Sequence, residues 1–511
     1  MLLDIIGIAV FVILFIAFAV VSYEGSRFRR GNLRKLSEWG LAGRRLGPYL
    51  AWFLLGADVF TAYTFVAVPS LAFASGSTAF FAVPYVAIVF AIAMLTMPKL
   101  WGISRKRGYV TASDFVRDRF NSRALSVIVA ITGVVAVLPY IALQIAGMQS
   151  VLTIMLYGTS DITVVSEGAL VIAFVVLAAT TFTSGLRGVT LGAIFKDTLI
   201  FLTVIVVILA VLLSYGGFSS AFTNIASAKA ALASNYTHLP AASVPGFVSL
   251  FFGSALALYL YPHIINGSLS ANSKKSLRRS LSLLPIYSIG LALLALFGIL
   301  IYAVPGALSI VKSTGNGLLT VPALVVTTLP GWLAGICLLG IFIGGMVPAA
   351  LMAIAGANLI SRNIIREFKP KISADTETRI AKWTSAALKF IALGFVFVAP
   401  LTYAIQLQLL GGIIILQILP AVFLGLFTRR LDWKALIMGW TSGMASGIYL
   451  VLLANHFGAL VTSNTSTPYG LIYIGVVSVA LNIIVSVVFS LAFKWAGIFR
   501  KGLIRESELA S

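Results

Sequence analysis

Apolar runs of about twenty residues recur from one end of this 511-residue chain to the other. A helix of that length crosses the hydrocarbon core of a bilayer and satisfies its own backbone hydrogen bonds there. With 60% hydrophobic and 10% charged residues, the chain is too apolar for a soluble domain. We predict an all-α integral membrane protein with about thirteen transmembrane helices. They cover residues 2–23, 47–75, 79–101, 124–156, 163–184, 188–214, 246–270, 280–304, 331–361, 380–402, 406–427, 434–455 and 470–495.

Basic residues decide the predicted orientation. They gather in the connections after the first, third, seventh, ninth, eleventh and thirteenth helices, while the opposite connections hold little beyond Lys229 and Lys312. Because cytoplasmic loops carry the excess of Lys and Arg, we expect the N-terminus outside and the C-terminus in the cytoplasm, with the chain in the cell (plasma) membrane. The net charge of +21 then requires no nucleic-acid partner.

Two segments in the N-terminal half of the chain are a signal-peptide-like apolar run and an amphipathic stretch. The first apolar run is too long for a signal peptide, and its basic residues follow it, so we expect a retained helix. Residues 108–123, GYVTASDFVRDRFNSR, predict a short amphipathic helix lying at the inner membrane surface.

Motifs of catalysis and cofactor binding are absent from the sequence. The single cysteine, Cys337, excludes an intramolecular disulfide, and there are only three histidines. No nucleotide-binding glycine loop and no GxSxG motif occur. We therefore predict that the protein is not an enzyme and uses no cofactor beyond a coupling ion.

The second predicted helix carries an acidic residue in the stretch LLGADVFTAYTFVAVP, residues 54–69. A charge near the bilayer centre costs roughly 3 kcal/mol, so Asp58 indicates a functional position. Gly56 and Pro69 weaken the helix on either side of it, which predicts a locally opened segment lining a polar site. The alternative is that Asp58 caps a helix near the membrane surface.

Three other helices contain polar or helix-breaking residues. Pro262 should bend or break the seventh helix, and His263 beside it is either a proton carrier or a structural residue. Tyr140 and Gln144 share one face of the fourth helix, where they contact a polar substrate or hold helices together. The small residues of 331–361 predict a close packing seam.

Lys196 and Asp197 are adjacent in the sixth helix. Because neighbouring residues do not face each other on a helix, we expect each to find a partner elsewhere, such as Arg187.

Several motifs together resemble the sodium/solute symporter family, from about residue 30 to about residue 430. They are SEWGLAGRRLGPYLAWFLLGAD, PYIALQI and LYLYPHIINGSLSANSKK. Four shorter pieces are similar to the monocarboxylate (lactate and pyruvate type) permease branch of that family: GADVFTAYTFVAVP, TSGLRGVTLGAIFKD, LYPH and VPAALMAIAGANLISRNI.

The resemblance implies a leucine-transporter-like core made of two five-helix inverted repeats, with the first helix of each repeat broken around the substrate. The whole chain is then one transporter domain. Its parts are an extra first helix with a cytoplasmic linker (1–46), the first repeat (47–214), the second repeat (246–427), two additional helices (434–495) and a cytoplasmic tail (496–511).

The resemblance also implies where a coupling ion binds. It places the carbonyls of a sodium site on Ala57 and Phe60, but the two hydroxyl positions fall on Val347 and Pro348, which have no side-chain oxygen. A hard cation needs several oxygen ligands, so sodium binding should be weak. We hypothesise that Asp58 carries a proton in its place, although sodium could instead bind with Asp58 as its ligand.

For the substrate, the resemblance implies a small monocarboxylate, an organic anion. Candidate contacts are Thr61, Tyr63, Gln144, Tyr261 and His263, and inner-gate candidates are Arg187 and Asp197.

Three functions remain open from the sequence. The first is a proton-coupled symporter of a small monocarboxylate working by alternating access. The second is a sodium-coupled symporter of an amino acid, sugar or vitamin. The third is a channel or membrane sensor, which is disfavoured because no repeated pore-lining charges occur and the C-terminal tail is short. The oligomeric state is not predicted.

Overall fold

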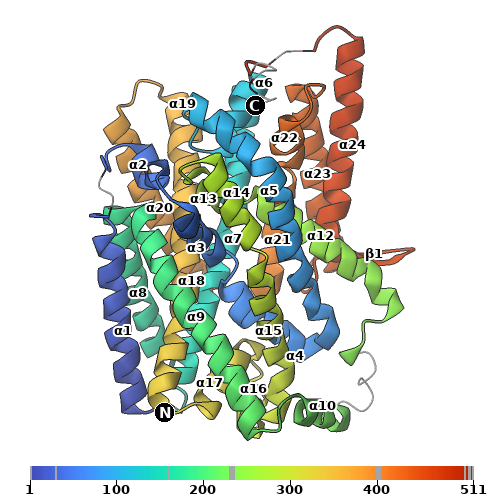
Figure 1. Ribbon diagram of the computed structural model, residues 1–511. Helices are drawn as coiled ribbons and strands as arrows, with labels where there is room; N and C mark the ends of the chain where they lie inside the picture. Colours follow the sequence, from blue (N-terminus) through green and yellow to red (C-terminus); the bar gives the residue numbers. More distant parts are fainter. Residues whose placement is uncertain are drawn as a thin grey trace.

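The computed structural model describes residues 3–28, 31–158, 162–228, 236–398, 404–499, 502–504 and 508. Within these ranges most of the helices run side by side as one bundle (Figure 1). The first part contains α1 (Ile5–Glu24), α2 (Leu36–Gly40), α3 (Pro48–Ala57), the π-helix η2 (Tyr63–Ala67), α4 (Val68–Ser75), η3 (Gly76–Phe81), α5 (Ala82–Arg107), α6 (Ala112–Phe120), α7 (Arg123–Met155), α8 (Ile162–Ser184), α9 (Leu186–Ser214) and α10 (Gly217–Ala228). The second part contains α12 (Val244–Leu260), α13 (Pro262–Leu269), α14 (Lys274–Leu283), α15 (Ile286–Leu300), α16 (Pro305–Thr314), α17 (Thr320–Thr328), α18 (Gly331–Leu359), the π-helix η7 (Ile360–Ile365), α19 (Arg366–Phe368), α20 (Ala374–Val398), α21 (Ala404–Leu416), α22 (Leu419–Val422), α23 (Trp433–Ala454) and α24 (Ile474–Trp495).

The described residues include 11 helices long and apolar enough to cross a membrane, or up to 12 if the bent pair Gln406–Leu416 and Leu419–Leu426 counts as one span. One of the 11, Tyr63–Arg107, joins parts of two predicted spans because η2, α4, η3 and α5 follow one another directly. The short helix α3 supplies the beginning of the predicted span 47–75. The prediction of about thirteen spans is thus consistent with the structure.

Both helices that were expected to be interrupted are interrupted. α3 ends at Ala57, and regular α-helix resumes only at Val68, after the π-helix η2. α12 ends at Leu260, and Tyr261 has an extended ψ of 135° before α13 starts at Pro262. Proline at this position has no N–H to continue the preceding helix. The predicted opening near Asp58 and the predicted break at Pro262 are confirmed.

α18 forms the centre of the bundle, where it packs against α1, α7, α9 and α20. Its apolar part is almost entirely buried. At Gly345, an added Cβ would lie 2.6 Å from the carbonyl oxygen of Gln144 on α7. Small side chains along α18 therefore allow close helix contact, as the sequence predicts.

The amphipathic helix α6 forms where the sequence predicts it, but its surroundings differ from the prediction. Thr111 and Asp114 form a capping box at its start. Phe115 and Phe120 are buried, and α6 packs against α7 and α22 rather than presenting this face to lipid. The sequence pattern identifies an apolar face but does not identify what covers it.

A β-hairpin precedes the last helix. β1 (Asn464–Thr467) pairs antiparallel with β2 (Gly470–Tyr473), so α24 starts at Ile474 and not at residue 470 as predicted. Tyr473 anchors the hairpin, because its amide donates to Ser249 Oγ on α12 (3.0 Å) and its hydroxyl donates to the Leu409 carbonyl on α21 (2.6 Å).

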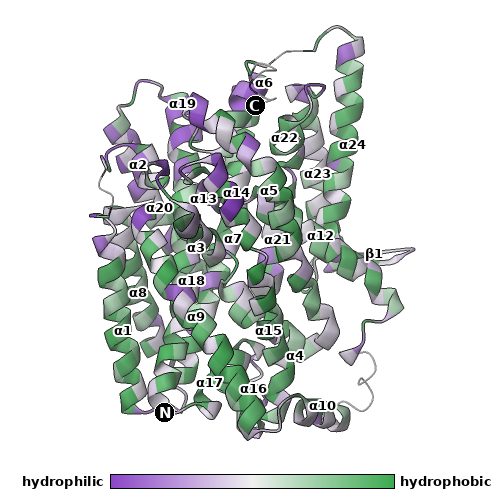
Figure 2. Cartoon of the chain, in the orientation of Figure 1, coloured by the Kyte–Doolittle hydropathy of each residue, from purple (hydrophilic) through white to green (hydrophobic). Residues whose placement is uncertain are grey.

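Hydrophilic residues gather at the end of the bundle that carries α2, α6 and α19, at the top of Figure 2, while hydrophobic residues dominate along the helices. α1 begins at the opposite end, and α24 ends at the hydrophilic one (Figure 1). Ion pairs link the basic residues here to acidic ones, for example Arg117 and Arg123 to Glu367 at 3.0 and 3.2 Å. The predicted connection around Lys229 lies outside the described residues.

Candidate transport site

The segment between α3 and η2 has an opened backbone. The Thr61 amide donates to the Val59 carbonyl (3.1 Å) and to Thr64 Oγ1 (3.0 Å) instead of continuing α3 to the Ala57 carbonyl. The Thr64 amide in turn donates to the Thr61 carbonyl at 2.9 Å rather than to that of Phe60. The carbonyls of Ala57 and Phe60, in the interior of the protein, are therefore available to a donor from another helix.

Gln144 on α7 binds a backbone amide of the opened segment. Its Oε1 accepts a hydrogen bond from the Ala62 amide at 2.9 Å, and its Nε2 donates to the Tyr140 carbonyl at 3.2 Å. An added Cβ at Gly147 would lie 2.3 Å from the Ala62 Cβ, so the two helices meet closely. Gln144 thus holds the opened segment, as the helix-holding alternative expected.

Lys196 on α9 binds the two free backbone carbonyls of the opened segment. Its Nζ donates to the Ala57 carbonyl at 3.0 Å and to the Phe60 carbonyl at 2.6 Å. These are the two carbonyls that the resemblance assigns to a coupling ion. Lys196 is fully buried, and it is not among the site residues predicted from the sequence. The sequence signal that could have identified Lys196 is its position deep in an apolar helix, where a charged side chain requires a specific partner.

The neighbouring Asp197 lies in the same network. Its Oδ1 is 2.9 Å from Lys196 Nζ, and its Oδ2 accepts a hydrogen bond from the Tyr287 hydroxyl on α15 at 2.7 Å. Tyr287 lies against Gly56 of α3, where an added Cβ would be 2.1 Å from the Tyr287 hydroxyl oxygen. The absence of a side chain at Gly56 therefore gives room for the tyrosine that holds Asp197.

Arg187 is not the partner of this pair, contrary to the prediction. Its guanidinium pairs with Glu38 on α2, and Glu38 is also 3.5 Å from Arg45. Lys196 and Asp197 pair with each other instead, because a lysine side chain is long enough to bend toward an adjacent carboxylate. Arg187 lies ten positions before Asp197 on α9, which corresponds to about 15 Å along the helix. The two inner-gate candidates thus belong to different clusters, and their gating role stays a prediction.

Asp58 caps the end of α3 and is almost completely buried. It interacts electrostatically with Lys196 and Asp197. Neither of its carboxyl oxygens has a hydrogen-bond partner in the described part of the chain. A buried polar group without a partner is costly, so this carboxyl group is a candidate for binding a proton or a ligand. Asp58 therefore caps a helix, as the alternative expected, but its side chain is buried among other helices and not at an exposed surface.

Aromatic side chains form the second half of the candidate site. The ring centroids of Tyr140, Tyr261 and His263 lie 5.2 to 5.6 Å from one another, and Tyr63 contacts Tyr85 at 6.3 Å. The hydroxyls of Tyr63 and Tyr261 and both ring nitrogens of His263 lack hydrogen-bond partners among the residues that the structure describes. All are buried. This cluster can supply hydrogen-bond donors to a small polar ligand.

The other residues predicted for the site are less available to bind a ligand. Thr61 Oγ1 accepts a hydrogen bond from the Tyr63 amide at 3.2 Å, so it supports the backbone of the opening. Val347 and Pro348 are buried in α18 and offer no side-chain oxygen. Across the described ranges, no group of three or more His, Cys, Asp or Glu side chains is placed to hold a metal ion.

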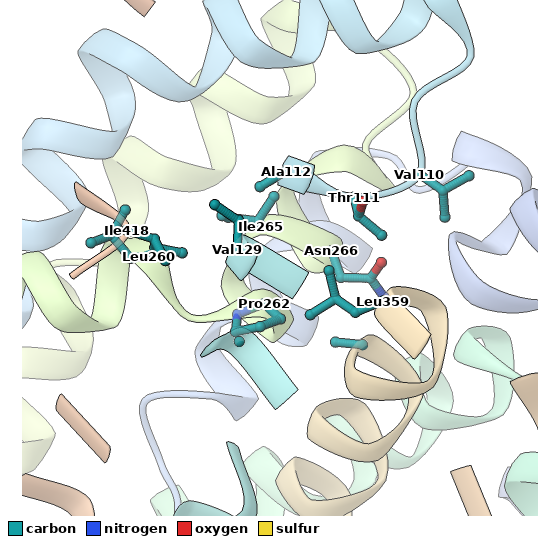
Figure 3. Close-up of a pocket in the computed structure, with 12 residues that line it drawn as sticks. Val110, Thr111, Ala112, Val129, Leu260, Pro262, Ile265, Asn266, Leu359 and Ile418 are labelled. Carbon is teal, nitrogen blue, oxygen red and sulfur yellow. The ribbon is translucent and has the colours of Figure 1, made fainter. Parts of the chain in front are cut away.

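A cavity of about 20 Å³ lies beside the second break, next to Pro262 (Figure 3). Asn266 at its wall donates to the Gly40 carbonyl at 2.8 Å and accepts from Asn358 Nδ2 at 3.1 Å. Thr111, which precedes α6, also lines it. These contacts tie α13 to α2 and α18.

Comparison with known proteins identifies the family. Residues 39–443 match the sodium:solute symporter family. A monocarboxylate transport permease protein of Rhizobium johnstonii is 38% identical over 94% of this chain and 96% of its own length. YodF, an uncharacterised symporter of Bacillus subtilis, is 32% identical over 81% of this chain and 82% of its own length.

A solved structure shares the fold. It is a Na⁺-coupled sialic acid symporter in a substrate-bound outward-open state, with a TM-score of 0.73, 16% identity, and coverage of 96% of this chain and 98% of that one. The predicted all-α, leucine-transporter-like architecture is confirmed. Because the family match extends over most of the chain, this protein belongs to the sodium:solute symporter family.

Proposed function

We propose that the protein is a secondary active transporter that moves a small monocarboxylate together with a proton. Membership in a symporter family makes it a membrane transporter and not an enzyme. The single observation that carries the proposed proton coupling is the buried Asp58 carboxyl group, which adjoins the opened segment and has no hydrogen-bond partner among the described residues. In the same place, Lys196 already occupies the two carbonyls available to a sodium ion.

The substrate class rests on two supports. The 38% identical relative over nearly the whole chain is named a monocarboxylate transport permease. In addition, the hydroxyls of Tyr63 and Tyr261 and the ring of His263 are buried donors without partners in the described structure. Such donors suit a carboxylate, which accepts several hydrogen bonds and gains more from each than a neutral group does.

The proton and the substrate are coupled by the charges of Asp58 and of the substrate carboxylate. An ionised Asp58 and a carboxylate substrate repel each other strongly in a buried site, whereas a protonated Asp58 removes that repulsion. Asp58 takes up a proton from the outer side, the anion binds, and both leave on the inner side after the broken helices rearrange. One proton and one monocarboxylate carry no net charge, so the proton gradient and not the membrane potential drives this step.

Uptake by purified protein in proteoliposomes tests the substrate and the ion together. Labelled small carboxylates, amino acids and sugars are offered under separately imposed proton and sodium gradients. We expect saturable uptake of a small monocarboxylate with counterflow, and protein-free vesicles report passive entry of the undissociated acid. Uptake of only an amino acid or a sugar excludes the proposed substrate class, and a flux without saturation or counterflow indicates a channel.

A sodium-coupled cycle is the second candidate. The Asp58 oxygens, which lack hydrogen-bond partners in the part of the chain that the structure describes, are hard ligands suited to sodium, and the solved symporter with this fold is Na⁺-coupled. The same vesicles decide between the two ions, because a sodium gradient at equal pH on both sides drives uptake only in this second case.

We further propose that the protein lies in the cell membrane with its N-terminus outside and its basic, hydrophilic end in the cytoplasm. Cys337 is the only cysteine, so its replacement by alanine gives a background for single-cysteine labelling. Lys312→Cys and Lys371→Cys are both at exposed positions. We expect an impermeant thiol reagent to label the first in intact cells and the second only after permeabilisation; the opposite pattern contradicts this orientation.

A further inference from the structure

We propose that the Lys196 ammonium is a tethered cation that takes the place of a free metal ion at the opened segment, and that removing it creates a binding site for a small monovalent cation. The inference relies on the proposed function only in treating the opened segment after α3 as part of the transport site.

The geometry around Lys196 Nζ is that of a coordinated cation. Three oxygens lie within 3.0 Å of it: the Ala57 carbonyl at 3.0 Å, the Phe60 carbonyl at 2.6 Å and Asp197 Oδ1 at 2.9 Å. An ammonium group has three N–H groups and no acceptor. Two of its N–H groups donate to the Ala57 and Phe60 carbonyls, and its charge is paired with the Asp197 carboxylate.

The charges around the ammonium support the same assignment. The ionisable side chains that interact with Lys196 are Asp197 on its own helix and Asp58 at the end of α3. Tyr287 on α15 donates to the far oxygen of Asp197 and fixes its orientation. α18, which also packs against α9, contributes no acidic or basic side chain along Gly331–Leu359. A single positive charge is thus surrounded by two carboxyl groups and two carbonyl dipoles.

The ammonium also keeps α3 open. Carbonyl groups in the membrane interior need a partner, and unwound helices of transporters usually give theirs to a bound ion. Here a side chain of the same chain supplies that partner. Unlike a metal ion, a lysine cannot be released into the cytoplasm, so it does not add an ion to each transport cycle. The proton on Asp58 is then the coupled cation.

Two substitutions at position 196 separate a charge effect from a packing effect. Lys196→Ser removes the ammonium and leaves space, an added hydroxyl oxygen and the Asp197 carboxylate. Lys196→Met removes the charge but keeps most of the side-chain volume. Only the serine variant should accept a free cation, because the methionine fills the space beside the carbonyls.

The first measurement is direct binding of ²²Na⁺ to purified protein without any transported substrate. We expect saturable binding by Lys196→Ser, competed by methylammonium, and none by the wild type or by Lys196→Met. If Lys196→Ser is unstable in detergent, sodium or methylammonium should raise its melting temperature while leaving that of Lys196→Met unchanged. The inference is overturned if the wild type binds ²²Na⁺, or if Lys196→Ser shows neither binding nor stabilisation.

The second measurement is uptake of the substrate found for the wild type. In sodium-free medium both variants should fall by about tenfold or more, equivalent to about 1.4 kcal/mol. Sodium or methylammonium should restore Lys196→Ser only. Wild-type rates in Lys196→Met without sodium overturn the inference. If no carboxylate is transported, the proposed function fails, but ²²Na⁺ binding still decides the role of Lys196.

Discussion

Asp58→Asn is expected to abolish proton-driven uptake. Asparagine has nearly the shape of a protonated aspartate but cannot release or take up a proton, so the variant is held in the neutral form. Because the Asp58 carboxyl has no hydrogen-bond partner in the described structure, the amide breaks no existing hydrogen bond. We expect the initial rate under an inward proton gradient to fall at least about tenfold, to the level of protein-free vesicles, while exchange of labelled for unlabelled substrate at equal pH continues.

A matched control is Asp4→Asn. Asp4 caps α1 through a hydrogen bond from the Gly7 amide at 2.7 Å, and asparagine caps a helix about as well as aspartate. Asp4 belongs to α1 and contacts none of the groups at the α3 opening, so its substitution should leave both exchange and proton-driven uptake unchanged. Proton-driven uptake at the wild-type rate in Asp58→Asn contradicts a coupling role for Asp58.

The largest effect on stability is expected from Asp197→Asn. The substitution leaves the fully buried Lys196 ammonium without its carboxylate partner. Breaking one side of a buried ion pair typically destabilises a protein by about 3–5 kcal/mol. We expect poor expression and a clearly lower melting temperature in detergent, measured by the loss of the monodisperse peak after heating.

The double variant Lys196→Met/Asp197→Asn tests the cause of that loss. With both charges removed, part of the stability should return because no buried charge is left unpaired, while the Ala57 and Phe60 carbonyls still lack their donor. Tyr287→Phe, which removes only the 2.7 Å hydrogen bond to Asp197, should cost about 1.5–3 kcal/mol. If the Asp197→Asn protein is as stable as the wild type, the Asp197 carboxylate does not stabilise the buried Lys196 ammonium.

Most of the fold could be predicted from the sequence because its signals are local. An apolar run of bilayer length requires a helix, and Pro262 cannot donate the hydrogen bond that would continue α12. Gly56 and Asp58 indicated the opening of α3 for similar reasons. The hairpin of β1 and β2 was missed since its short, mixed segment directly adjoins the apolar run of α24.

The site could be predicted only in part. Asp58, Tyr261 and His263 stand out in the sequence because they interrupt apolar helices. The contacts of Lys196 with Ala57 and Phe60 do not, because they join residues more than one hundred positions apart and depend on how α9 is rotated against α3. For the same reason the sequence could not show that Arg187 pairs with Glu38.

The most direct test of the central claim is uptake of a labelled small monocarboxylate into sodium-free proteoliposomes, with the outside made one pH unit more acidic than the inside. Proton-coupled symport predicts saturable uptake well above that of protein-free vesicles, insensitive to added sodium and lost in Asp58→Asn. A protein that takes up the substrate only when a sodium gradient is imposed, and ignores the pH difference, contradicts the account.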